Sequence, residues 1–308
     1  MTDRKDNTLH AAEAAVKSCY ATWAESYYAD YYHAQGAYPP VHLKLVRDLI
    51  ASSGVKTLLD AGCGPASMLR GLTDLGLDLH GFDLTPEMVA EARKVMADRG
   101  VAGTRIWQGS VADPAAFRAP TGGPTAFDAA ICIGVLPHVP SSLDDQVITN
   151  LRDAVRPGGL VAIEARNQLF ALFTLNRYSY EFFLDELIDR QALAKHGGAD
   201  SASLDRAFAT IAARFRTDLP TVRKGKHDEP GYDEVVSRTH NPLILKERFA
   251  AAGFSDVSLL FYHYHCLPPM VEVELPDLFR AASLAMEDPH DWRGHFMASA
   301  FILAGRRT

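Results

Sequence analysis

An acidic residue and two glycines follow a short apolar segment near position 60. Leu58 and Leu59 end a run of strand length, and residues 60–65 read Asp-Ala-Gly-Cys-Gly-Pro. Glycines permit a tight turn in which the backbone approaches a ligand closely, and proline suits the first position of a helix. The segment therefore predicts a strand, a tight turn and a helix. This arrangement binds nucleotide-like cofactors at the carboxyl end of a parallel strand.

The glycines alone are compatible with two kinds of cofactor. A dinucleotide fingerprint needs a third glycine or an alanine three residues after Gly64, and this chain has Ser67 there. Asp60 discriminates further, because its carboxylate would repel a pyrophosphate and attract an ammonium or sulfonium group. A cofactor with a positive charge is therefore favoured over a dinucleotide.

A second acidic residue, Asp83, ends the next predicted strand and lies 19 positions after Gly64. This spacing is close to the ~20 residues at which an acid accepts hydrogen bonds from ribose hydroxyls. Leu84 and Met88 follow and are suited to sandwich an adenine, although methionine serves equally well as adaptable core packing. Asp83 thus predicts nucleoside binding without choosing between the two cofactors.

Residues 59–64 resemble the first motif of the class I S-adenosylmethionine-dependent methyltransferases, whose acidic residue and glycines surround the methionyl part of the cofactor. Further motifs follow in the order of that family: Asp83, the segment 127–139 and the Pro-Gly-Gly turn at 157–159. The resemblance covers roughly residues 58–164. It implies S-adenosylmethionine as methyl donor and S-adenosylhomocysteine as product. The cofactor contacts that it implies are Asp60, Gly62, Cys63, Gly64, Asp83, Leu84, Met88, Cys132 and Ile133.

The adenine site departs from the family pattern. Members commonly carry an acid directly after the glycine that ends the third strand, and this acid meets the adenine amino group. This chain has Ser110 after Gly109, and its acid comes only at Asp113. Adenine recognition is therefore open between Ser110, the backbone at Val111 and Asp113.

Three histidines are candidate catalytic residues. His138 lies in the loop that leaves the fourth strand, beside the cofactor in the family, and is a base, a positioning group or a structural loop residue. His263 and His265 alternate along a predicted strand and are expected to point to one face, for substrate contact, base catalysis or packing. A metal would need a third ligand that the sequence does not place, so we expect none.

Aromatic residues dominate the predicted helices before residue 50. Tyr20, Trp23, Tyr27 and Tyr31 have the spacing of one helical face. This face either packs on the core or forms a lid over a small polar ligand, since tyrosine combines a flat ring with a polar tip. Residues 23–27 are similar to the caps of small-molecule methyltransferases, which implies that Tyr20 and Tyr27 contact the cofactor.

Beyond Arg166 the alternation of strands and helices stops, and helical patterning continues to about residue 240. Basic residues of this segment either face an anionic acceptor or belong to a solvated helical surface. Arg166 leaves the carboxyl edge of the fifth strand, and Arg177 lies in an aromatic segment beside Tyr178. These three residues are the predicted substrate-binding residues.

The order of elements predicts an α/β fold with a Rossmann-like, doubly wound sheet. Two further strands at 257–266 and 296–304 complete seven, and the family resemblance implies that the last one is antiparallel. We expect an N-terminal helical cap at 1–52, a cofactor-binding core at 53–166, a helical lid insertion at 167–240 and the C-terminal part of the core at 241–308.

Composition narrows the class of protein. A chain of 308 residues with 47% hydrophobic and 22% charged residues is typical of a globular protein, and the net charge of -7 argues against a nucleic-acid-binding surface. The four cysteines form no C-x-x-C pair, which favours a reducing cytoplasm. Neither a signal peptide nor a membrane span is recognisable. We therefore expect a cytoplasmic protein without nucleic-acid or membrane partners, and the oligomeric state stays open.

The predicted function is methyl transfer from S-adenosylmethionine to a small-molecule metabolite, with an O or N nucleophile favoured over S or C. A sulfonium methyl group is already activated, so holding donor and nucleophile in line is the main catalytic contribution. A base is needed only when the acceptor arrives protonated. The alternatives are an NAD-dependent oxidoreductase and a non-catalytic cofactor-binding subunit.

Overall fold

The computed structural model describes residues 2–32, 39–120, 123–195, 200–219, 225 and 227–308, with the side chains of residues 2–7 left out. The chain divides into two compact units. The first comprises Met1–Arg166, Val222–Leu260 and Ala300–Thr308, and the second comprises Asn167–Thr221 and Phe261–Ser299. The second unit therefore joins residues 261–299 to residues 167–221.

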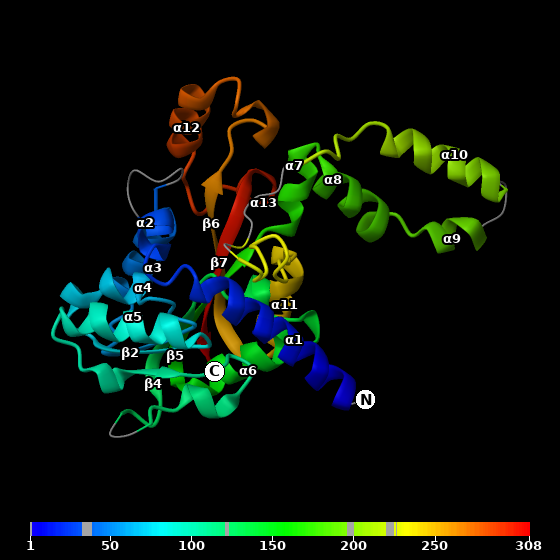
Figure 1. Ribbon diagram of the computed structural model, residues 1–308. Helices are drawn as coiled ribbons and strands as arrows, with labels where there is room; N and C mark the ends of the chain where they lie inside the picture. Colours follow the sequence, from blue (N-terminus) through cyan, green and yellow to red (C-terminus); the bar gives the residue numbers. More distant parts are fainter. Residues whose placement is uncertain (1, 33–38, 121–122, 196–199, 220–224, 226) are drawn as a thin grey trace. The chain divides into compact units, whose positions relative to one another are not determined.

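The described residues form a seven-stranded sheet in the order β3-β2-β1-β4-β5-β7-β6 (Figure 1). Neighbouring strands among β1 to β5 pair in parallel, and β7 pairs antiparallel with β5. This confirms the predicted fold class, including the direction of the last strand. The strands are β1 Thr57–Ala61, β2 Asp78–Asp83, β3 Ile106–Gln108, β4 Phe127–Cys132, β5 Val155–Arg166, β6 Phe254–Tyr264 and β7 Ala298–Arg307.

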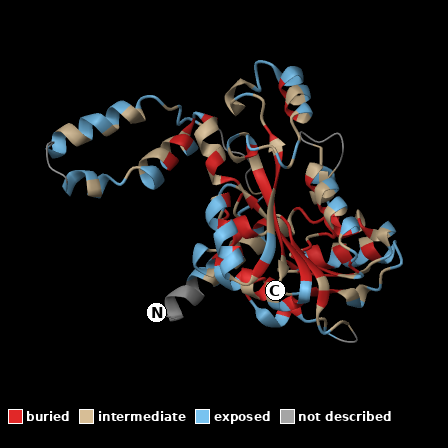
Figure 2. Cartoon of the chain, turned by 180° about the vertical axis from the view of Figure 1, so that it is seen from behind, coloured by how far each residue is buried: buried red, intermediate tan, exposed pale blue. Residues whose placement is uncertain are grey.

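The central strands are buried along nearly their whole length (Figure 2). Continuous apolar runs such as Leu58–Leu59 and Ala129–Cys132 are expected in parallel strands that are covered on both faces. β1 lies between β2 and β4, so the strand order reverses at β1. In doubly wound sheets the crevice at such a reversal, outside the carboxyl ends of the strands, is where ligands bind.

The helices of the first unit include the N-terminal α1 and several that follow strands. α5 starts with Pro86 at its first turn, and α11 starts where the Asn241 side chain accepts a hydrogen bond from the Leu243 N–H, at 3.0 Å. These helices are α1 Thr2–Ala21, α2 Tyr27–Tyr32, α3 Val41–Ser52, α4 Ser67–Arg70, α5 Pro86–Ala97, α6 Asp144–Ala154 and α11 Pro242–Ala251. Short single-turn helices include η3 Pro114–Phe117 and η4 Leu136–His138.

The N-terminal aromatic residues do not lie on one continuous helix, so that part of the prediction is wrong. α1 ends at Ala21, and residues 22–26 form turns before α2. The Thr22 hydroxyl donates to the Cys19 carbonyl at 2.9 Å, which favours the end of the helix at this point. The rings of Tyr20 and Trp23 nevertheless meet edge to face, with centroids 5.3 Å apart.

The second unit contains short helices and two longer ones. Its residue Asn167 donates through Nδ2 toward the carbonyl oxygens of Gly294 and Ala298, at 3.1 and 2.8 Å, and thereby ties its two chain segments together. α9 and α10 contain no buried residue among those described (Figure 2). The helices of this unit are α7 Ala171–Thr174, α8 Arg177–Glu181, α9 Arg190–Lys195, α10 Ser201–Ala212, α12 Pro276–Ala285 and α13 Gly294–Met297.

Candidate functional site

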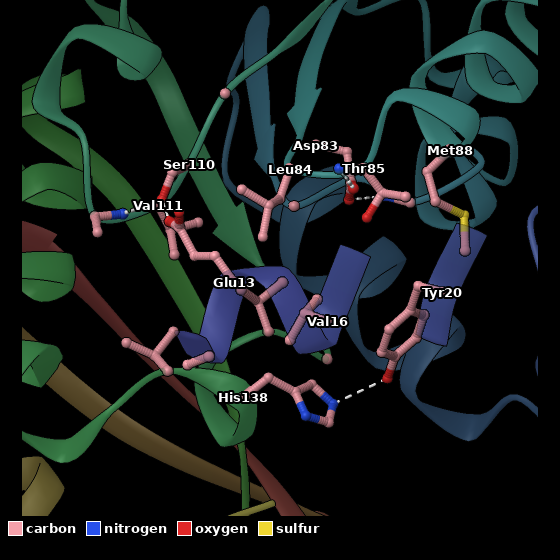
Figure 3. A pocket seen from close by; sticks show the side chains of 18 of the residues that line it. Glu13, Val16, Tyr20, Asp83, Leu84, Thr85, Met88, Ser110, Val111 and His138 are labelled. Carbon is pink, nitrogen blue, oxygen red and sulfur yellow. Dashed lines mark hydrogen bonds between the residues drawn. The ribbon is translucent and has the colours of Figure 1, made fainter. Parts of the chain in front are cut away.

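A cavity that is partly open to solvent lies at the carboxyl ends of β1, β2 and β4 in the first unit (Figure 3). Pockets with a largely apolar lining and a few polar groups hold cofactors and other small molecules. One wall is α1, and the others include the segments that follow β1, β2, β3 and β4. The predicted site residues that line the cavity are Tyr20, Tyr27, Gly62, Gly64, Asp83, Leu84, Met88, Ser110, Val111, Ile133 and His138.

The turn after β1 requires glycine for both conformation and space. Gly62 has a φ of +85°, and a Cβ there would lie 2.3 Å from the Val135 side chain. Gly64 also has a positive φ, of +53°, and its N–H donates to Asp83 Oδ2 at 2.8 Å. The Thr85 N–H donates to Asp83 Oδ1, also at 2.8 Å. Asp83 thus ties the glycine turn to the end of β2 and fixes the shape of this part of the cavity.

Asp60 lies beneath the turn and is only 1% exposed. Burial, with a contribution from the negative charge of Asp83, raises the pKa of the Asp60 carboxyl to about 8. A positively charged ligand nearby would favour the ionised carboxylate and offset this shift. Cys63 and Cys132 are buried close by, and burial together with Asp60 raises the pKa of both thiols. Asp60, Cys63 and Cys132 are not among the residues that line the cavity.

The three candidate residues for adenine recognition differ in whether they line the cavity. Ser110 and Val111 line the cavity, whereas Asp113 does not. The Asp113 carboxylate instead accepts the Ala115 N–H at 2.9 Å and caps the short helix η3. The Ser110 hydroxyl donates to Glu13 Oε1 of α1 at 2.5 Å. Sequence analysis missed Glu13, because no local pattern indicates which loop the N-terminal helix covers.

His138 lines the cavity from η4 and has a partner on each ring nitrogen. Its Nδ1 lies 2.7 Å from the Val236 carbonyl oxygen, and its Nε2 lies 3.0 Å from the Tyr20 hydroxyl (Figure 3). Because a carbonyl oxygen only accepts, Nδ1 carries the proton, and Nε2 accepts from Tyr20. Burial and then the Arg166 charge lower the pKa of His138 to about 4. The imidazole is therefore neutral at physiological pH.

A segment of residues 232–238, which sequence analysis also missed, supports His138 from outside the cavity. The Tyr232 ring stacks on Trp23 with centroids 5.6 Å apart and meets the His138 ring edge to face at 5.9 Å. Arg166 donates to the hydroxyls of Tyr232 and Ser237 in the same unit. Arg166 does not line the cavity, but its positive charge acts on a residue that does, since it lowers the pKa of His138.

Arg177 and Tyr178 lie on α8 in the second unit, where the Arg177 guanidinium carbon is 5.1 Å from the Tyr178 ring centre. Arg166 belongs to the first unit. The predicted substrate-binding residues are therefore divided between the two units.

His263 and His265 also belong to the second unit, and the prediction that they share one face of a regular strand is wrong. His263 has a left-handed backbone with a φ of +57°, and β6 ends at Tyr264, so strand alternation does not extend to His265. The His265 ring packs against Phe170 and Phe279, with centroids 4.7 and 5.6 Å away. Burial, followed by the neighbouring His263, lowers the pKa of His265 to about 4. In the described ranges, no three His, Cys, Asp or Glu side chains gather to hold a metal ion.

Comparison with known proteins identifies relatives of the sheet region. Residues 59–161 match the family model described as a methyltransferase domain. A protein named ubiquinone biosynthesis O-methyltransferase from Xanthomonas campestris is 33% identical over 136 residues, which are 44% of this chain and 53% of that protein. One of the same name from Burkholderia multivorans is 28% identical over 221 residues, or 72% of this chain and 83% of that protein. The chain thus spans about half the length of the Xanthomonas relative.

Among solved structures, an S-adenosylmethionine-dependent methyltransferase from Mesorhizobium loti is 13% identical to this chain, with a TM-score of 0.47. The match covers 87% of this chain and 97% of that structure. Within the described part of the chain, we find no helix with the length and apolar character needed to span a membrane.

Proposed function

Since residues 59–161 form a methyltransferase domain, as the motifs around Asp60 and Asp83 predicted, we propose that the whole chain transfers a methyl group from S-adenosylmethionine to a small molecule. The observation that carries the proposal is the cavity at the carboxyl ends of β1, β2 and β4. It combines a glycine turn, a fixed carboxylate and an apolar lining, which are the features that a nucleoside with a charged sulfonium arm requires.

Within this cavity, the cofactor ribose would lie near Asp83, and the methionyl arm would lie near the glycine turn above Asp60. Burial favours the protonated state of Asp60 in the cofactor-free protein. A cationic ligand nearby would favour the ionised carboxylate instead and would interact favourably with its charge. A dinucleotide would bring a pyrophosphate toward the same buried carboxyl and repel its ionised form. The buried Asp60 carboxyl, whose ionised form a cation would stabilise and a pyrophosphate would repel, therefore supports a sulfonium cofactor over NAD.

We further propose an oxygen nucleophile on the acceptor. The two ubiquinone biosynthesis relatives carry O-methyltransferase in their names, which supports this choice over nitrogen. An acceptor with negative charge, such as a phenolate or a carboxylate, would gain from Arg166, whose charge adds to burial in lowering the pKa of His138 and opposes the rise that burial causes in the pKa of Tyr20. Arg177, Tyr178 and the second-unit histidines His263 and His265 stay predictions for acceptor contact.

His138 is better suited to position the acceptor than to act as its base. An imidazole with a pKa of about 4 holds a proton weakly compared with a phenol, whose pKa is about 10. The neutral ring instead fixes the Tyr20 hydroxyl by accepting a hydrogen bond from it, which leaves the lone pairs of the Tyr20 oxygen to receive a hydrogen bond from a donor group of the acceptor. This arrangement would orient the nucleophile toward the cofactor methyl group.

The cell compartment and partners that we propose are a cytoplasmic location and a small-molecule acceptor without nucleic acid. The four cysteines are free, and three of them are buried, as expected in a reducing compartment. The net charge of -7 is unfavourable for a polyanion.

Isothermal titration calorimetry of the full chain with S-adenosylhomocysteine and with NAD tests the cofactor. We expect S-adenosylhomocysteine to bind and NAD to give no heat. Binding of NAD alone would refute the proposal and favour an oxidoreductase. Cofactor binding without turnover on any acceptor would point to a non-catalytic subunit.

A further inference from the structure

One end of the cavity contains a carboxylate that comes from a distant part of the chain. Glu13 of α1 and Ser110 of the loop after β3 both line the cavity, and they are 97 residues apart in sequence. Figure 3 shows Glu13, Ser110 and Val111 together at one end of the view, with Tyr20 and Met88 at the other. Leu84 and Asp83 lie between these two ends in the same view.

The hydrogen bonds at this end leave the Glu13 and Ser110 side chains able to accept further hydrogen bonds but poorly able to donate them. The Ser110 oxygen accepts the Ala112 N–H at 3.1 Å, and its single proton goes to Glu13 Oε1 at 2.5 Å. A carboxylate has two oxygens with about four acceptor sites, of which Ser110 uses one. A ligand group that reaches this end of the cavity therefore needs a hydrogen-bond donor.

The rest of this end suits a flat heterocycle. Leu84, Val111 and Ile133 provide apolar surface in the cavity that Glu13 and Ser110 also line. Asp83, the last residue of β2, is the natural partner for a ribose. A nucleoside with its ribose at Asp83 and its base over Leu84 would extend toward Glu13 with the outer edge of the base.

We propose that Glu13 recognises the exocyclic amino group of the cofactor adenine, so that the N-terminal helix supplies the carboxylate which the loop after β3 lacks. This inference rests on the proposed function, because it assumes an adenosyl cofactor in the cavity. Ser110 is a positioning residue that holds the Glu13 carboxylate toward the base. The consequence is selectivity for adenine over hypoxanthine, since the 6-oxo group of hypoxanthine would face a carboxylate that cannot donate.

The position of Glu13 also couples cofactor binding to the cap. Leu9, Ala12, Glu13, Val16 and Tyr20 all line the cavity, and their spacing places them on one face of α1. Glu13 meets the purine end of the ligand, while Tyr20 lies beside His138. Bound cofactor therefore stabilises α1 on the cavity, and amide hydrogen exchange in residues 8–21 should slow when S-adenosylhomocysteine binds.

The test is calorimetry of the full chain with S-adenosylhomocysteine and with S-inosylhomocysteine, which carries a 6-oxo group in place of the amino group and an N1–H in place of the bare N1. We expect the unaltered protein to bind the adenine ligand at least about tenfold more tightly, as a charge-assisted hydrogen bond would require. Glu13→Gln should bring the ratio of the two affinities close to one, because an amide both donates and accepts. Ser110→Ala should reduce the ratio partly.

Glu25→Gln is the matched control, because Glu25 is exposed just after α1 and does not line the cavity. It should leave the ratio and the slowed hydrogen exchange unchanged. The ratio compares two ligands on one protein, so a general loss of stability in a variant does not imitate the effect. An unaltered protein that binds both ligands equally, or a Glu13→Gln variant that keeps the full preference, would overturn the inference. Binding of neither ligand by the unaltered protein would overturn the proposed function and the inference with it.

Discussion

At the scale of single residues, Asp60 is an acid that the fold keeps away from water. Its pKa of about 8 in the folded protein is well above the ~3.9 of an exposed aspartate. The folded state therefore binds this proton more tightly than the unfolded state. The Asp60 contribution to stability is fully present below about pH 4 and is lost as the pH rises toward 8.

Replacing Asp60 by Asn should remove this pH dependence. In the cofactor-free protein, the free energy of unfolding should fall between pH 4 and 8 by up to about 1.4 kcal/mol per pH unit from this one group, and the slope should be shallower in Asp60→Asn. Urea unfolding at a series of pH values measures the difference between the two proteins. Parallel curves would show that Asp60 is ionised in the folded state despite its burial.

Tyr20 and His138 form the second test at this scale. Tyr20→Phe keeps the ring that lines the cavity and removes the hydroxyl that His138 accepts. We expect kcat to fall about tenfold through lost positioning of the acceptor, with the affinity for S-adenosylhomocysteine changed by less than about twofold. Tyr31→Phe, which alters a residue outside the cavity lining, is the control. A loss of cofactor affinity equal to the loss of kcat would contradict the positioning role.

At the scale of elements, the ion pairs of Asp144 hold the segment that supports His138. Asp144 lies at the start of α6 and is 3% exposed. Arg238 approaches its carboxylate to 2.5 Å, and Arg248 of α11 approaches it to 3.4 Å. Burial alone would raise the pKa of Asp144, but the nearby His240, whose Nε2 lies 3.6 Å away, and the hydrogen-bonded Arg238 outweigh it and lower the pKa. The segment that includes Val236 is thus tied to α6.

Asp144→Ala should be strongly destabilising, because it leaves partly buried cations without their carboxylate. We expect a loss of about 3 kcal/mol in the free energy of unfolding, measured by chemical denaturation. The adjacent Asp145→Ala is the control, since the Asp145 side chain is 78% exposed and its change should stay within about 0.5 kcal/mol. Equal effects at the two positions would mean that the Asp144 ion pairs contribute little.

The elements also explain which parts of the site could be predicted from sequence. Asp83 ends a strand, and Gly62 and Ile133 directly follow strands. The end of a parallel strand is recognisable from local apolar runs and turn residues. Glu13 and Val236 reach the cavity and His138 from 97 and 98 residues away, through the packing of α1 and of an irregular segment. No local periodicity encodes such contacts. The interruption of the N-terminal helix at residues 22–26 and the left-handed His263 were missed for a similar reason, because tertiary context overrode the expected pattern.

At the scale of the whole molecule, the residues that match known methyltransferases and the remaining residues are expected to have different roles. Residues 59–161 contain β2 to β4, most of β1 and most of the residues that line the cavity. Tyr20, Glu13 and Arg166 lie outside that range, as does the entire second unit. We therefore expect cofactor chemistry to resemble that of the relatives, and acceptor selection to depend on the parts that the match does not cover.

The central claim is tested most directly by incubating the full chain with S-adenosylmethionine and small-molecule extracts and following products by mass spectrometry. We predict a compound that gains one methyl group, formed together with an equal amount of S-adenosylhomocysteine and only when protein and cofactor are both present. Gly62→Ala, which would place a methyl group against Val135 in the glycine turn, should abolish the product. Binding of NAD without any S-adenosylhomocysteine binding, and no methylated product across a broad range of extracts, would contradict the account.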